Sequence, residues 1–278
     1  MGKALSEDAV MQYATEGYYS PIDILSAEDV IRFRTALEEY EAGSGGPING
    51  PIRSKSHLLF PWVDDIIRHP KILDPVEDLV GPNILCWNSV WWIKEVNSDS
   101  FVSWHQDARY WGLNTDELVT VWLALSPARI ENGCMYVAPK THRGEMLPHQ
   151  DNYHDHNMLT RGQEIISGID KRTVVPMELN SGQISLHNVK LAHASGPNQG
   201  TDRRIGLSIH YIPTNARQLA VEWDTATLVR GEDHFKHFSL TPKTLEMFDP
   251  EAVKLHERAT HATREIVFKD ADRVRKII

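Results

Sequence analysis

Seven short segments between residues 84 and 212 are rich in Val, Ile, Trp and Thr, and they constrain the fold more than any other feature. These residue types suit the pleated, half-buried surface of a sheet. Turn residues such as Asn132-Gly133 and Ser181-Gly182 separate some of the segments. Many short strands bounded by turns indicate a β-sandwich or barrel. The predicted strands cover residues 84–96, 101–107, 118–126, 134–138, 173–179, 183–187 and 204–212.

Helical patterns flank these strands at both ends of the chain. Ser26 has the position of a helix N-cap, and apolar residues recur behind it at helical spacing until the Gly-rich stretch 42–47. Residues 61–80 predict one or two short helices, and an apolar stripe after Pro250 predicts another. We therefore expect one domain over residues 1–278, with an all-β core and helical N- and C-terminal segments.

Composition argues against several classes of protein. The net charge of -9 gives no broad basic surface, so we expect no nucleic-acid partner. No stretch of 18 apolar residues and no N-terminal signal sequence is visible, so we expect no membrane partner. Cys86 and Cys134 are the two cysteines and form no metal-binding or disulfide pattern, which fits a reduced, cytoplasmic setting. The expected partner is a small-molecule substrate, and the sequence leaves the oligomeric state open.

A pattern of metal-binding residue types begins inside the second predicted strand. His105 and Asp107 flank Gln106, and side chains two residues apart on a strand point to the same face. His193 follows 86 residues after Asp107, and Arg204 follows 11 residues later. Two imidazoles and a carboxylate suit non-haem iron, and an arginine can bind a carboxylate through two parallel hydrogen bonds. His-x-Asp alone is weak evidence, because so short a pattern recurs by chance.

Several stretches together resemble the phytanoyl-CoA dioxygenase family over about residues 20–215. Members are largely non-haem iron oxygenases that depend on 2-oxoglutarate and are built on a double-stranded β-helix, or jelly roll. The resemblance implies that fold, with Fe(II), 2-oxoglutarate and dioxygen. The matching stretches are Trp104-His105-Gln106-Asp107, Glu131-Asn132-Gly133-Cys134, Pro139-Lys140-Thr141-His142, His193-Ala194-Ser195-Gly196-Pro197-Asn198 and Arg203-Arg204-Ile205-Gly206.

The resemblance also implies roles for individual residues. His105, Asp107 and His193 take the places of the iron ligands, and Arg204 takes the place that binds the distal carboxylate of 2-oxoglutarate. Arg203 should face the other side of the same strand. The intact carboxylate at position 107 implies a hydroxylase that attacks an unactivated C–H bond, and argues against a halogenating relative.

Three further residues are candidates for the cosubstrate site. Ser195 matches a position where the family often places a hydroxyl near the cosubstrate carboxylate, and a turn serine is an equally good interpretation. Asn88 and Thr120 lie on predicted strands that could face the barrel interior, as do Lys94 and Trp122. For these strand residues, packing is the stronger alternative.

Substrate candidates follow directly on the iron motif. Arg109 could hold a phosphonate or carboxylate, and Tyr110 and Trp111 could enclose a quaternary ammonium, with packing at a strand end as the alternative. Relatives with a similar Trp-His-Gln-Asp-Ala-Arg-Tyr-Trp stretch hydroxylate aminoalkylphosphonates, so 2-aminoethylphosphonate or its N-trimethyl form is the leading prediction. Alternatives are an acyl-CoA, an amino acid or a secondary metabolite. A non-catalytic jelly-roll binding protein is the alternative of another class.

Residues 142–156 contain four histidines between two strand regions. This stretch predicts a long, irregular loop, which often serves as a lid or binding loop. A second metal site is the weaker alternative, because its histidine spacing lies outside a strand. Arg161, at the end of the stretch, could contribute a further cation to the substrate.

Overall fold

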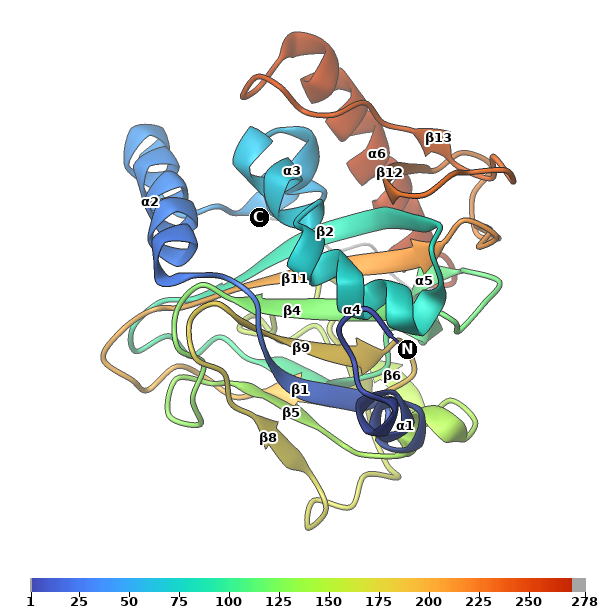
Figure 1. Cartoon of the computed structure of the whole chain (residues 1–278). Coiled ribbons are helices and arrows are strands. Elements are labelled where there is room, and N and C mark those ends of the chain that lie inside the picture. Colours follow the sequence, from blue (N-terminus) through green and yellow to red (C-terminus); the bar gives the residue numbers. More distant parts are fainter. Residues whose placement is uncertain (1, 272–278) are drawn as a thin grey trace.

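The chain folds around a large, mostly antiparallel sheet in the computed structural model, which describes residues 2–271. Figure 1 shows strands β2, β11, β4, β9 and β1 following one another across this main sheet. Beyond β2, the sheet continues through β12 to β13. Its strands are β1 (Tyr18–Asp23), β9 (Gln183–Asn188), β4 (Val119–Ala124), β11 (Arg204–Pro213), β2 (Ile84–Lys94), β12 (Thr225–Arg230) and β13 (Ser239–Leu240).

A smaller sheet of four antiparallel strands forms the other half of the β core. The arrangement is the jelly roll that the sequence predicts, and all seven predicted strands are present. The small sheet has the order β3 (Val102–His105), β10 (His193–Ser195), β5 (Met135–Val137) and β8 (Val175–Met177), and a separate hairpin joins β6 (His149–Asp151) to β7 (Gln163–Ile165).

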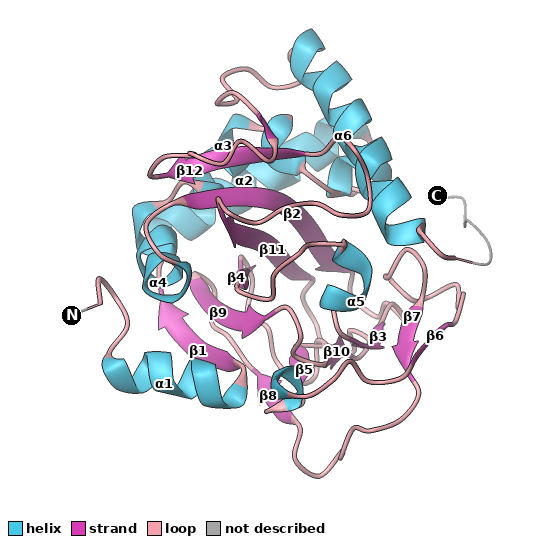
Figure 2. Cartoon of the chain, turned by 90° about the vertical axis from the view of Figure 1, so that its right-hand side faces the viewer, coloured by secondary structure: helices cyan, strands magenta, loops and turns pink. Residues whose placement is uncertain are grey.

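Helices cover one side of the main sheet. Figure 2 shows α2 and α4 against that side, while the small sheet and α5 lie on the other. Among the described residues, no helix combines the length and the apolar character that a bilayer crossing needs. The helices are α1 (Glu7–Glu16), α2 (Ala27–Ser44), α3 (Pro61–Ile67), α4 (Pro70–Val80), α5 (Ala108–Trp111) and α6 (Pro250–Phe268), with 3-10 turns η1 (Gly50–Arg53), η2 (Ser56–Leu58) and η3 (Thr141–Arg143).

Local capping explains where the long helices begin and end. The Ser26 hydroxyl accepts a hydrogen bond from the Asp29 amide at 3.1 Å, which confirms the predicted N-cap of α2. Gly45 ends that helix with a φ of 81°, a conformation that favours glycine. The Asp249 carboxylate caps α6 by accepting from the Glu251 and Ala252 amides, both at 3.0 Å. The helical ends of the chain are therefore as the sequence predicts.

The strand containing the His-x-Asp motif ends earlier than predicted. β3 stops at His105, and Asp107 already has helical backbone angles, with φ at -58° and ψ at -40°. Tyr110 and Trp111 accordingly lie on the one-turn helix α5 and not at a strand end. The sequence pattern also missed β1, β6, β7, β10, β12 and β13.

Candidate metal and cosubstrate site

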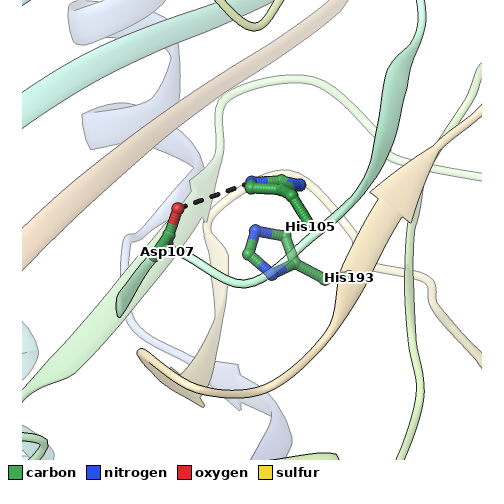
Figure 3. Close-up of side chains that lie close together, drawn as sticks. All are labelled: His105, Asp107 and His193. Carbon is green, nitrogen blue, oxygen red and sulfur yellow. Dashed lines mark ion pairs between the residues drawn. The ribbon is translucent and has the colours of Figure 1, made fainter. Parts of the chain in front are cut away.

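Two side chains from the small sheet and one from the turn that follows β3 meet at one point. His105 on β3 and His193 on β10 are direct partners across the antiparallel pair, so both imidazoles project from the same face. The helical turn after β3 brings Asp107 to the same place, with its Oδ1 3.4 Å from His105 Nε2 (Figure 3). One ligand atom from each residue lies within 4.8 Å of the other two.

Hydrogen bonds orient both imidazoles for metal binding. His105 Nδ1 lies 2.9 Å from the Ser103 carbonyl, and His193 Nδ1 lies 2.9 Å from the Leu191 carbonyl. A carbonyl oxygen only accepts, so Nδ1 of each ring carries the hydrogen and Nε2 keeps a free lone pair. Burial and the neighbouring His105 lower the pKa of His193 to about 4, which keeps that ring neutral.

The third group supplies the negative charge. Burial alone would raise the pKa of Asp107, but the adjacent His105 and the nearby His193 hold the pKa below its usual range. Two neutral imidazoles and an ionised carboxylate fit Fe(II), and this donor set leaves positions open for 2-oxoglutarate and dioxygen. Within residues 2–271, no other cluster of three or more potential metal ligands is found.

His105, Asp107 and His193 line a cavity of about 830 Å³ between the two sheets. The sequence-predicted residues Asn88, Tyr110, Trp111, Thr120, Ser195 and Arg204 all line it. Arg109 and Arg161 line a neighbouring pocket of about 490 Å³ instead, together with Tyr110 and His149. The cavity therefore brings together the predicted metal, cosubstrate and aromatic residues, but not these two predicted cations.

Arg204 marks one end of the cavity. The residue is 2% exposed, and its guanidinium donates to the carbonyls of Gly133 and Trp92 and lies over the Trp122 ring, with its central carbon 5.3 Å from the centroid. No carboxylate of the described residues lies within ion-pair distance, and Nε has no hydrogen-bond partner there. Burial lowers the pKa of Arg204 to about 10. Such a buried cation fits an anionic ligand.

Lys94 lies beside Arg204. The sequence favoured a packing role for Lys94. The two residues are cross-strand partners on β2 and β11. The ammonium of Lys94 donates to the Ser195 hydroxyl at 2.7 Å and to the Gly196 carbonyl. Burial and the nearby Arg204 lower the pKa of Lys94 to about 6. Arg204 and Ser195 therefore line the cavity together, and Lys94 holds the Ser195 hydroxyl, whereas Arg203 points away and pairs with Glu41 and Glu95.

A row of polar side chains crosses the main sheet further along the cavity. Strand register pairs Asn88 with His210, His210 with Thr120, and Thr120 with His187. All four are buried, and the Thr120 hydroxyl, both ring nitrogens of His187 and Nδ1 of His210 have no partner among the described residues. Trp111 stacks on His210 with ring centroids 4.2 Å apart. We refer to Asn88, Thr120, His187 and His210 as the polar row.

Burial also sets the charge of the polar row. It lowers the pKa of His210 to about 4 and that of His187 well below the usual range. The row is thus a neutral surface of hydrogen-bonding groups. His187 and His210 were not predicted from the sequence, because their position in the cavity depends on strand register. Their alternation with apolar residues on β9 and β11 is the sequence signal that could have identified them.

Arg161 serves as a link between segments. It donates to the Asp151 carboxylate at 2.6 Å from Nε, and to the Val267 carbonyl at 3.0 Å from Nη1. These contacts tie the β6–β7 hairpin, which occupies part of the predicted irregular loop, to the end of α6. His149 in that hairpin accepts from the Gln106 amide at 3.1 Å and packs edge-on against Tyr110.

Residues 13–206 match the phytanoyl-CoA dioxygenase (PhyH) family. The chain belongs to this family. A probable alpha-ketoglutarate-dependent hypophosphite dioxygenase of Stutzerimonas stutzeri is 27% identical over 235 residues, which cover 74% of this chain and 78% of that protein. The peroxisomal phytanoyl-CoA dioxygenase of Bos taurus is 29% identical over 238 residues, covering 76% and 69%. The solved structure of the non-heme monooxygenase ThoJ has a TM-score of 0.83 and 32% identity, covering 94% of this chain and 98% of ThoJ.

As a phytanoyl-CoA dioxygenase family member, the protein is a 2-oxoglutarate-dependent non-haem iron dioxygenase. Its cofactor is Fe(II), and its cosubstrates are 2-oxoglutarate, also called alpha-ketoglutarate, and dioxygen. The family acts on small-molecule substrates. The alternative of a non-catalytic binding protein is not supported.

Proposed function

We propose that the enzyme hydroxylates an unactivated C–H bond of a small polar substrate, and that this substrate is an aminoalkylphosphonate such as 2-aminoethylphosphonate or its N-trimethyl form. His105, Asp107 and His193 would hold Fe(II), and Arg204 with Ser195 would bind the distal carboxylate of 2-oxoglutarate. The bound metal and cosubstrate supply the oxidant from dioxygen. The chain's own task is to orient the C–H bond and to exclude water.

The division of the cavity is the observation that carries this proposal. Arg204 and His210 lie on the same strand, six residues apart, which corresponds to roughly 20 Å of extended chain. The polar row lies beside the candidate metal ligands His105, Asp107 and His193, which we call the metal group. The His187 and His193 ring centroids are 4.8 Å apart. A cosubstrate held at Arg204 therefore leaves the polar row, with Tyr110 and Trp111, for a substrate.

A substrate with both a cation and polar oxygens suits that half of the cavity. Tyr110 and Trp111 contribute aromatic rings to the lining, and aromatic rings can attract an ammonium group. The polar row offers hydroxyl, amide and imidazole groups for the remaining oxygens. The Stutzerimonas stutzeri relative, named for hypophosphite, supports a phosphorus-containing substrate. The Bos taurus relative keeps an acyl-CoA as the alternative substrate.

Two wider expectations belong to the same proposal. Cys86 and Cys134 are both buried free thiols, which supports a reduced, cytoplasmic location. The net charge of -9 supports an enzyme that does not bind nucleic acid.

Spectroscopy followed by a substrate panel tests the proposal. Anaerobic addition of Fe(II) and 2-oxoglutarate should produce the metal-to-ligand charge-transfer band. Succinate release should then be measured with aminoalkylphosphonates, betaine-like zwitterions, amino acids and acyl-CoAs. We expect the aminoalkylphosphonates to stimulate release most. Stimulation by acyl-CoAs alone would refute the proposed substrate, and absence of the band would refute the proposed site.

A further inference from the structure

A second arginine lines the same cavity as Arg204. Arg53 ends η1, and its guanidinium carbon lies 4.5 Å from the ring centroid of Trp92. Among the described residues, the hydrogen-bond partner of its side chain is the Met158 carbonyl, 3.3 Å from Nη2. No carboxylate of the described residues is within ion-pair distance of Arg53. This side chain is thus a cation on the cavity wall without an acidic partner there.

The charge of Arg53 is costly where it lies. Burial lowers the pKa of Arg53 to about 10, and no nearby acid opposes that shift. Arg161 and Arg203 differ, because carboxylates at 2.6 Å neutralise each of them. An unpaired cation in a low-dielectric site favours the binding of an anion. Arg53 shares with Arg204 the lack of an acidic partner among the described residues, although Arg53 is half-buried and Arg204 is buried.

Two such arginines call for two anionic groups. In the proposed function, Arg204 would bind the distal carboxylate of 2-oxoglutarate, and the metal held by His105, Asp107 and His193 would neutralise the other carboxylate. Arg53 therefore remains for an anion that the cosubstrate does not supply. Its position agrees, because the next residue, Ser54, forms a bridge with Val90 on β2, beside the polar row.

Neighbouring contacts hold the site ready for a ligand. The Trp92 indole donates to the Ser208 hydroxyl at 2.9 Å, which fixes the ring beneath the Arg53 guanidinium. A guanidinium over an aromatic ring keeps its outward edge available for two parallel hydrogen bonds. Phosphonate and carboxylate groups match that edge.

We propose that Arg53 binds the oxyanion of an acidic substrate, a phosphonate or a carboxylate, and is the residue that selects for this charge. The inference rests on the proposed function and deepens it. It places the anionic group at Arg53, in the metal-containing cavity, and not at Arg109 or Arg161 in the adjoining pocket.

Calorimetric titration of the anaerobic enzyme, loaded with Fe(II) and saturated with 2-oxoglutarate, tests the assignment. Methylphosphonate and acetate serve as probes, and they separate a tetrahedral oxyanion from a planar carboxylate. We expect Arg53→Gln to weaken binding of the preferred probe about 10- to 100-fold. Arg53→Lys should recover part of the affinity, because it keeps the charge and loses the fork. Glutamine retains a donor for the Met158 carbonyl, so the melting temperature should hold.

Three controls make the outcome decisive. Arg172→Gln removes an exposed arginine that does not line the cavity and should leave probe affinity within about twofold. Unchanged affinity in Arg53→Gln, an equal loss in Arg109→Gln, or no binding of either probe by the unsubstituted enzyme would each overturn the inference. The charge-transfer band distinguishes failure of the proposed function from failure of the Arg53 assignment. Absence of the band would refute the proposed function. If the band forms, the probe titrations test the role of Arg53 alone.

Discussion

The two faces of the main sheet are built from the same strands but have opposite characters. The outer face, towards the helices, is apolar and fully buried, whereas the inner face lines the cavity and is largely polar. On β11 the outer residues are Ile205, Leu207 and Ile209, and the inner ones are Arg204, Ser208 and His210. Because strand side chains alternate between faces, one short segment serves both stability and chemistry. Adjacent positions should therefore respond to substitution in different ways.

The largest expected effect follows from breaking the metal group on the cavity side. His105→Ala leaves His193 and Asp107 without the third ligand, so we expect succinate formation to fall at least about a thousandfold. The melting temperature should change little, because the outer-face core is untouched. Succinate assays and thermal unfolding measure the two effects. His237→Ala, at an exposed histidine, is the matched control, and wild-type turnover by His105→Ala would contradict the assignment.

A substitution on the outer face of the main sheet should lower stability without affecting 2-oxoglutarate binding. Leu207 is fully buried in the outer core, so Leu207→Ala should lower the free energy of unfolding by about 2–5 kcal/mol. The KM for 2-oxoglutarate should stay near wild type in the fraction that remains folded. Urea denaturation and steady-state kinetics together test this. A large change in that KM would show that the two faces are coupled.

Neighbouring arginines allow the same comparison with charge. Arg204→Lys keeps the positive charge but loses the planar fork, so the KM for 2-oxoglutarate should rise about 10- to 100-fold. Arg203→Lys is the matched control, because Arg203 points away from the cavity to Glu41 and Glu95. Steady-state kinetics with varied 2-oxoglutarate separate the two variants. Equal rises in both would reject the alternation argument at this end of the strand.

How far the sequence predicts this site depends on whether the signal is local. The His105-x-Asp107 motif and the eleven-residue step from His193 to Arg204 are readable directly from the chain. Even there, the expected strand geometry was wrong at Asp107, since a helical turn, not strand alternation, brings its carboxylate to the metal group. The seven core strands were also predictable, because their composition marks each one separately.

The remaining site residues required information that a single sequence does not contain. His210 and His187 come together with Thr120 only through the register of three strands. Arg53 lies in a short 3-10 turn with no periodic pattern, yet it reaches the cavity, whereas Arg109, adjacent to the motif, lines a different pocket. Of the three predicted residues that follow the metal motif, Tyr110 and Trp111 line the cavity, whereas Arg109 lines the neighbouring pocket.

The smallest expected effect comes from a single hydroxyl in the polar row. Thr120→Val preserves shape and removes an oxygen that has no partner among the described residues, so the free energy of unfolding should stay within about 1 kcal/mol. The loss of one hydrogen bond should raise the KM of the organic substrate about two- to tenfold, with Thr120→Ser as the control that keeps the hydroxyl. Kinetics with each substrate varied in turn decide its role. A rise in the KM for 2-oxoglutarate alone would place Thr120 at the cosubstrate, as the sequence predicts. Thr120 would then belong to the cosubstrate half of the cavity and not to the substrate half.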